Sequence, residues 1–158
     1  TQPIQQKGFF TKLKEQTPTT MGAKELGGVS IGLSPAQNEQ EHVESYRLPV
    51  DYMDLIIYTG FGYPGRDLLF TRSCDALLIG CGRIGTIHEF TIAFEDGKPI
   101  GVLEGPWTMG EQIKDMIAKG NRPADKVIFD DDPKRLVEKV IAMVEADKAV
   151  LKAEAPHL

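Results

Sequence analysis

The chain has 158 residues, of which 41% are hydrophobic, and its formal net charge at pH 7 is -5. This length suits one domain with a real core rather than two. The acidic balance and the lack of any face-forming run of Lys and Arg argue against a nucleic-acid partner, because a phosphate backbone would be repelled.

No apolar run approaches the roughly 20 residues that a membrane-spanning helix needs, and no apolar signal core opens the sequence. We therefore expect no membrane partner and a cytoplasmic location. Cys74 and Cys81 have no His or Cys partner at metal-ligand spacing, so we expect reduced thiols and no metal site. The acidic run 130–132 is interpreted as a solvated helix entrance.

Short apolar runs alternate with helical patterns along the chain, which is typical of a parallel sheet with crossover helices. The predicted strands cover residues 29–33, 54–58, 76–79, 100–103 and 127–129. Residues 21–26 are predicted to be the last turns of a helix. The other predicted helices cover residues 66–73, 86–95, 108–119 and a last segment from 133, with Asp132 as its cap. Residues 1–18 show no clear period and are predicted to be an irregular segment, and residues 149–158 a tail.

The most informative segment is the glycine-rich turn at residues 80–85, which joins the predicted strand 76–79 to the predicted helix 86–95. Backbone N–H groups at such a turn point outward unpaired, and the helix dipole adds partial positive charge. An anion such as a nucleotide phosphate can therefore be held there without a lysine. The sequence predicts nucleotide binding.

A second glycine loop, at residues 59–65, follows the predicted strand 54–58 and contains Gly60 and Gly62. Loops at the carboxyl ends of strands are where open parallel sheets bind ligands. We include Gly60 and Gly62 in the predicted ligand-binding set.

From about Gly22 to Val144, the chain resembles the LOG family of Rossmann-like nucleotide-binding proteins, often labelled lysine-decarboxylase-like. The resemblance is carried by residues 22–28, 32–35 and 98–103 and by Arg66, Gly82, Gly85, Thr86 and Glu89. It implies a single three-layer Rossmann-like α/β domain over residues 19–148, with a mostly parallel sheet and helices on both faces. It also implies a homodimer or a larger homo-oligomer.

In that family, a Pro-Gly-Gly-x-Gly-Thr-x-x-Glu motif binds the phosphate of a nucleoside monophosphate. An arginine one helix upstream works with the glutamate to hydrolyse the N-glycosidic bond. The resemblance therefore implies Glu89 and Arg66 as catalytic residues acting on an AMP-like nucleotide, with no cofactor required. A carboxylate can stabilise an oxocarbenium-like state and orient water. Nothing marks the Schiff-base lysine that a pyridoxal enzyme would need.

The predicted phosphate ligands are Gly82, Arg83, Gly85 and Thr86. Cys81 and Arg83 stand where the family motif has its proline and second glycine. Arg83 could pair with a phosphate or fill the site.

Two further departures bear on the site. Asp67 replaces the lysine that follows the family arginine, which puts a negative charge near the expected anion. The family's first strand and its glycine turn, a βαβ unit ahead of Gly22, are not recognisable.

Alternative interpretations stay open. Thr86 and Glu89 have the spacing of a capping box, which would give Glu89 a structural role. Arg66 at a predicted helix start opposes the dipole's preference and suggests a ligand or a carboxylate partner.

The histidines and the aromatic region outside the motif, His42, His88 and Trp107 with Met109, are interpreted as surface, core or interface residues. The second hypothesis for function is a non-catalytic nucleotide- or cofactor-binding carrier, resembling molybdenum-cofactor carriers.

Overall fold

The computed structural model describes residues 18–106 and 109–154. The predicted N-terminal segment up to residue 17, Trp107, the predicted helix start at residue 108, and the last four residues lie outside this range. The chain divides into two compact units, one up to Arg66 and one from Asp67 onward, and each is described by itself.

The first unit holds two parallel strands. Its elements are α2 (Pro18–Glu25), β1 (Ile31–Ser34), α3 (Glu39–Glu44), β2 (Leu55–Tyr58) and the start of α4 (Gly62–Arg72). The two strands pair in register from Ile31 opposite Leu55 to Ser34 opposite Tyr58. Just before β1, the backbone N–H of Ser30 donates to the Asp54 carboxylate at 2.8 Å, and Lys24 also pairs with that carboxylate. This hydrogen bond from Lys24 lowers the pKa of Asp54.

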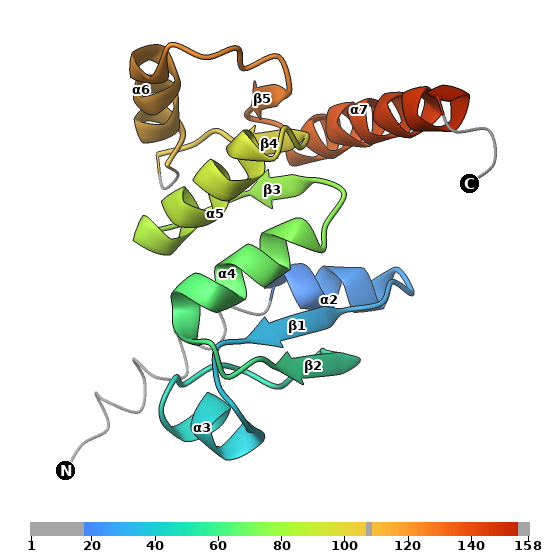
Figure 1. Cartoon of the computed structure of the whole chain (residues 1–158). Coiled ribbons are helices and arrows are strands. Elements are labelled where there is room, and N and C mark those ends of the chain that lie inside the picture. The colour runs from blue at the N-terminus through green and yellow to red at the C-terminus, as the bar shows by residue number, and fades with distance from the viewer. Residues whose placement is uncertain (1–17, 107–108, 155–158) are drawn as a thin grey trace. The chain divides into compact units, whose positions relative to one another are not determined.

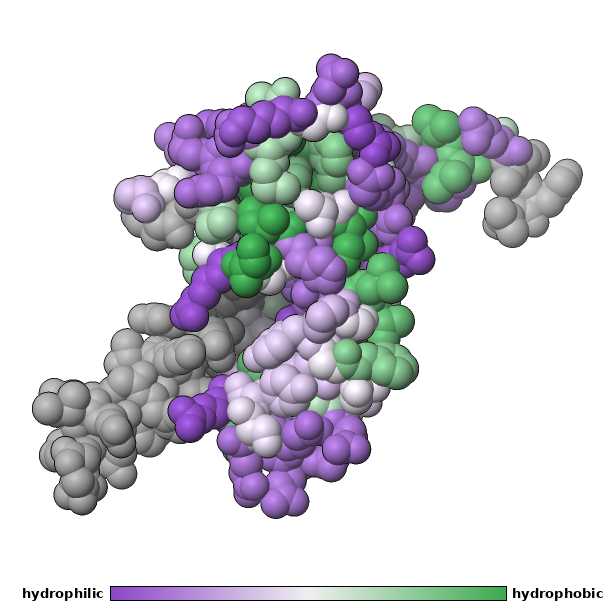
Figure 2. Space-filling model, turned by 60° about the vertical axis from the view of Figure 1, so that its left-hand side comes forward, coloured by the Kyte–Doolittle hydropathy of each residue, from purple (hydrophilic) through white to green (hydrophobic). Residues whose placement is uncertain are grey.

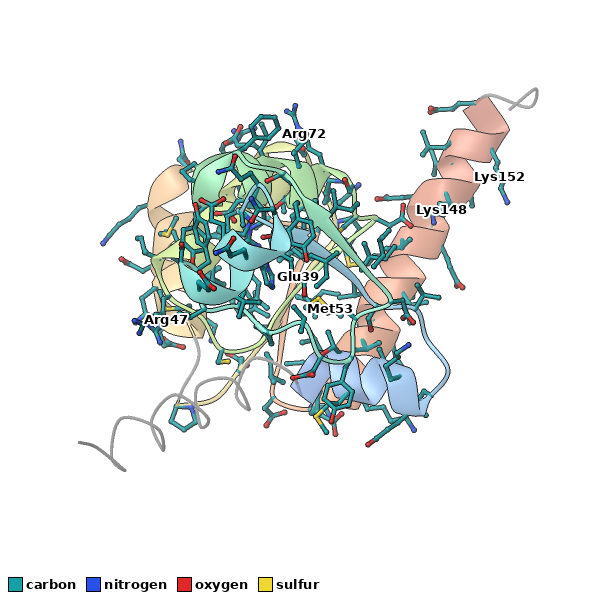
Figure 3. The ribbon with its side chains drawn as sticks, turned by 90° about the horizontal axis from the view of Figure 1, so that it is seen from below. Glu39, Arg47, Met53, Arg72, Lys148 and Lys152 are labelled. Atoms are coloured by element: carbon teal, nitrogen blue, oxygen red, sulfur yellow. The ribbon has the colours of Figure 1, made fainter. Side chains whose placement is uncertain are left out.

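The packing of the first unit depends on a close approach and a buried histidine. A Cβ at Gly32 would lie 2.5 Å from the Met53 sulfur, so a larger residue there would have to displace the Met53 side chain; Met53 is labelled in Figure 3. His42 is 3% exposed, with Nδ1 2.8 Å from Ser34 Oγ and Nε2 3.0 Å from the carbonyl oxygen of Pro49. His42 is therefore a packing residue, as its sequence context indicated.

Helix α3 was not among the predicted elements. Asn38 caps it by accepting a hydrogen bond from the backbone N–H of Glu41 at 2.9 Å. The Glu41 carboxylate reaches back to the N–H of Gln37 at 2.8 Å. An Asn followed three residues later by Glu is a recognisable helix-start signal, so this helix could have been found from the sequence.

The second unit is built around three parallel strands. Its elements are the end of α4, β3 (Leu77–Ile79), α5 (Ile84–Glu95), β4 (Ile100–Leu103), α6 (Gly110–Gly120), β5 (Val127–Asp130) and α7 (Pro133–Glu154). The strand order is β3-β4-β5, with Leu77 opposite Ile100 and Ile100 opposite Val127. Parallel alignment brings the carboxyl ends of all three strands to one edge of this sheet.

Alternation along β4 divides the core of the second unit between two faces. Ile100 and Val102 are fully buried in a cluster that includes Phe90 of α5 and Ile113 of α6. Gly101, between them, faces α7. Figure 1 shows α5 and α6 on one side of these strands and α7 on the other. Helices therefore cover both faces of this sheet, as predicted.

The α/β class with parallel strands is confirmed, but the strands form two sheets instead of one. Doubly wound sheets place their first strand in the middle of the strand order. No such strand lies among the described residues, where β1 pairs only with β2, and β3 pairs only with β4.

Helices α4, α5 and α7 differ in their bounds from the sequence-based prediction. Helix α4 begins inside the predicted glycine loop, at Gly62, and α5 begins at Ile84. Helix α7 continues to Glu154, through part of the predicted tail. The residues that extend it, 149–154, are mostly Ala, Leu, Lys and Glu, which are strong helix formers.

Several large apolar side chains are exposed, above all those of Leu26 (91%), Ile84 (82%) and Val29 (75%). Figure 2 shows green hydrophobic areas between hydrophilic ones on the face that it draws, including one near the C-terminal end of α7. Within residues 18–106 and 109–154, no helix is both long and apolar enough to span a membrane.

Gly101 gives a direct test of the packing between β4 and α7. An added Cβ would lie 2.7 Å from Val140 Cγ2 and 2.8 Å from Leu78 Cδ2, so we expect Gly101→Ala to cost about 1–3 kcal/mol in the free energy of unfolding. Gly120→Ala, where a Cβ meets open space, should instead stabilise by about 0.4–1 kcal/mol. Urea denaturation measures both. Equal effects of the two substitutions would contradict this packing.

Candidate functional site

The start of α5 differs in register from the sequence-based prediction. Arg83 is the N-cap, with extended backbone angles (φ -134°, ψ -159°), and its N–H donates to Thr86 Oγ1 at 3.3 Å. The N–H groups of Thr86 and Ile87 both donate to the Arg83 carbonyl, at 2.9 and 3.3 Å. Thr86 is therefore the third residue of the helix and not its cap.

This register overturns the interpretation of Thr86 and Glu89 as a capping box. That interpretation needs Glu89 three residues after the cap, whereas Glu89 lies six residues after Arg83 and so in the second turn. The reason is that the Thr86 hydroxyl already accepts the cap's own N–H. The structural role proposed for Glu89 as a capping residue is wrong.

The same geometry leaves two donors at the helix start. Intrahelical geometry gives the first N–H groups of a helix no acceptor, and here Ile84 and Gly85 precede the first bonded amides. Both residues are exposed, and a Cβ at Gly85 would meet nothing within 4 Å. At Gly82, by contrast, a Cβ would lie 2.5 Å from Thr86 Cβ. Gly82 therefore shapes the turn, and Gly85 keeps the amides accessible.

A histidine–carboxylate pair lies beside this helix start. His88 Nδ1 is 2.9 Å from Asp67 Oδ2, and the Asp67 side chain is only 3% exposed while that of His88 is 43% exposed. Asp67 is therefore not a bare negative charge turned toward a bound anion. Sequence reasoning missed this pair because its members are 21 residues apart on two helices.

The glycine loop after β2 belongs to the first unit. Gly60 (φ +67°) and Gly62 (φ +64°) have left-handed backbone angles that favour glycine. Their N–H groups donate to the carbonyls of Ala36 and Pro35, at 2.9 and 3.0 Å. The backbone N–H groups of both glycines therefore hydrogen-bond within the first unit.

Arg66 is five residues into α4 instead of at a helix start, so the dipole argument for a ligand does not apply to it. Its guanidinium carbon lies 5.8 Å from the centre of the Tyr63 ring, within the range of a cation–π contact.

Asp130, at the carboxyl end of β5, is the one residue of the acidic run 130–132 that departs from the solvated interpretation, because Asp131 and Asp132 are exposed. Its side chain is 3% exposed and accepts hydrogen bonds from Arg135 at 2.5 and 2.8 Å and from Lys139 at 2.7 Å. These bonds hold the pKa of Asp130 far below its usual range. Asp132 caps α7 as predicted, because its carboxylate accepts the Arg135 N–H at 2.8 Å.

In the described part of the chain, no group of three or more His, Cys, Asp or Glu residues could hold a metal ion.

A cavity of about 440 Å³ lies at the opposite, amino end of the strands. Its charged lining is paired: Lys148 bonds Asp75 and Lys126 bonds Asp147, both at 2.7 Å. Figure 3 labels Lys148 on α7. Burial raises the pKa of the Cys74 thiol in this cavity, which makes that thiol less reactive. These ion pairs connect α7 to the residues that precede β3 and β5, so they have a structural role.

Comparison with known proteins gives a family for this arrangement. Residues 17–137, most of the chain, match the SLOG cluster4 family. The chain belongs to that family. The LOG-like character expected from the glycine motif is thereby confirmed.

Similar proteins support the fold of this SLOG chain. A solved structure, the molybdenum cofactor binding protein from Rippkaea orientalis, is 25% identical with a TM-score of 0.61, over 79% of this chain and 68% of that one. A second structure, TM1055, is 22% identical with a TM-score of 0.57, over 80% and 69% of the two chains. An uncharacterised protein from Archaeoglobus fulgidus is 33% identical over 85 residues, which are 54% of this chain. The matched region is half of that relative's length.

The cap assignment predicts the effect of changing Thr86. Thr86→Val removes the hydroxyl that accepts the Arg83 N–H, so we expect a loss of about 1 kcal/mol in the free energy of unfolding. Thr86→Ser keeps the acceptor and should recover most of that loss. Equilibrium unfolding in urea measures both variants, and a neutral Thr86→Val would contradict the assigned cap.

Proposed function

We propose that this SLOG protein binds a nucleoside 5′-monophosphate, with the phosphate at the start of α5. The observation that carries this proposal is the junction of β3 and α5. There the N–H groups of Ile84 and Gly85 precede the first helical bonds, under a surface left open by Gly85. Helix N-termini with exposed amides favour anions, and Arg83, exposed beside them, adds a positive charge.

The reaction we propose is hydrolysis of the N-glycosidic bond, giving a free base and ribose 5-phosphate. Glu89 is the residue expected to orient water and stabilise the oxocarbenium-like state, and Arg66 is expected to clamp phosphate or ribose through its planar guanidinium. The family resemblance assigns these roles. The register of α5 is compatible with the role of Glu89, because it places this residue in the second turn, beyond the cap formed by Arg83 and Thr86.

A second candidate function is a non-catalytic cofactor carrier. It is favoured by one observation, the similarity to the Rippkaea orientalis protein that binds the molybdenum cofactor. In this case the same amides and Arg83 would bind a phosphate of the cofactor, and Glu89 would perform no chemistry.

We also propose that the protein is a homodimer or a larger homo-oligomer. Exposed apolar residues support such a contact, including Val150 (56%) and Leu151 (63%) at the end of α7. Apolar area of this kind is commonly covered by a partner.

The test of hydrolysis is incubation with a panel of nucleoside 5′-monophosphates, followed by detection of free base and ribose 5-phosphate. We expect Glu89→Gln to lower the rate by at least about 100-fold, because it removes the charge needed in the transition state. The ligand-induced rise in melting temperature should remain.

Glu95→Gln is the matched control, because Glu95 lies at the other end of α5, in an exposed ion pair with Arg122. It should keep full activity. A rise in melting temperature without release of base from the unmodified protein would favour the carrier. If no nucleotide raises the melting temperature and none releases a base, the proposed binding of a nucleoside monophosphate is contradicted.

A further inference from the structure

The Asp67–His88 pair joins α4 to α5 within the second unit. Asp67 is buried, and burying a carboxylate is costly unless it is paired. His88 supplies the pairing at 2.9 Å while keeping 43% of its own side chain exposed. Asp67 is therefore held in the interior, while the imidazole of His88 that pairs with it is accessible from outside.

The carboxylate fixes which nitrogen of the imidazole faces outward. An ionised carboxylate can only accept, so Nδ1 of His88 carries the proton toward Asp67. The other ring nitrogen, Nε2, has no hydrogen-bond partner among the described residues. A buried carboxylate behind Nδ1 is the arrangement that orients a histidine for proton transfer through Nε2.

The position of His88 on α5 places it beside the open surface. Residues three and four apart share a helix face, so His88 and Glu89 both lie about one turn after Gly85. Side chains on a helix also tilt toward its N-terminus. The positions of His88 and Glu89 are therefore one turn from Gly85, where a Cβ would meet nothing within 4 Å.

We propose that His88, oriented by Asp67, is the general acid that protonates the departing base. This inference rests on the proposed hydrolysis. His88 acts as the imidazolium, with one proton on Nδ1 toward Asp67 and a second on Nε2. As the bond from C1′ to the base nitrogen breaks, its electron pair stays on the base, and the Nε2 proton passes to the base, which leaves His88 neutral. Water forms the new bond to C1′ and gives its proton to Glu89. Solvent returns that proton to His88, so the net reaction consumes one water.

The test compares two substrates that differ in their need for an acid. One is the nucleoside monophosphate that the protein cleaves, and the other is 4-nitrophenyl riboside 5′-phosphate, whose nitrophenolate leaves without a proton. His88→Gln can still donate to Asp67 but cannot transfer a proton. We expect it to lower kcat for the nucleotide by about 100-fold or more and to change kcat for the nitrophenyl substrate less than about 3-fold.

Two carboxylate variants complete the design. Asp67→Asn should lower kcat for the nucleotide by about 10-fold while leaving the nitrophenyl substrate and KM little changed, because a positioning residue acts only through His88. The matched control is Asp96→Asn, which removes the exposed ion pair of Asp96 with Arg72 of α4. It should leave both substrates unaffected.

The outcomes separate this inference from the proposed function. Equal loss on both substrates in His88→Gln, with an unchanged melting temperature, would show that His88 does not act by protonating the base and would overturn the acid, while hydrolysis itself would stand. Unchanged turnover of both substrates would overturn the acid as well. If the unmodified protein releases no base from any nucleotide, both the hydrolysis and the acid are overturned.

Discussion

The parallel register of β3, β4 and β5 is the constraint on which the second unit depends. Ile100 and Val102 on the middle strand are fully buried, so this strand cannot shift by one residue without exchanging its two faces. Gly101 tightens the same constraint by admitting α7 on the other face. The register fixes where β3 ends and therefore where the turn at Gly82 can begin α5. The open amides and the Asp67–His88 pair follow from that starting point.

Charge is distributed unevenly over the carboxyl end of this sheet. At β5, Asp130 is buried and held by Arg135 and Lys139, so its charge is compensated within the protein. Asp67 is likewise buried and paired, in this case with a partly exposed histidine. At the start of α5, by contrast, Arg83 and the open helix amides present positive charge outward. An acidic protein can in this way hold a small anion at one place while its net charge disfavours a polyanion.

The sequence predicted the strands and the class of fold because period and composition are local signals. It predicted the glycine turn for the same reason, since glycines between a strand and a helix are visible in a short window. It misplaced the start of α5 because the Thr86 hydroxyl could cap the helix or accept from the cap, and spacing alone does not distinguish these. It missed the Asp67–His88 pair because that contact depends on how two helices pack. The pairing of strands into two sheets is also non-local.

We propose above all that the start of α5 binds the phosphate of a nucleotide. The most direct measurement is a titration of ¹⁵N-labelled protein with AMP, followed by two-dimensional amide NMR. If the phosphate binds there, the amide signals of Ile84 and Gly85 shift most and saturate together, and the Arg83 amide signal shifts slightly less. Saturating shifts confined to the amino end of the strands, around Lys98 and Lys126, would contradict this proposal, as would no shift at Gly85.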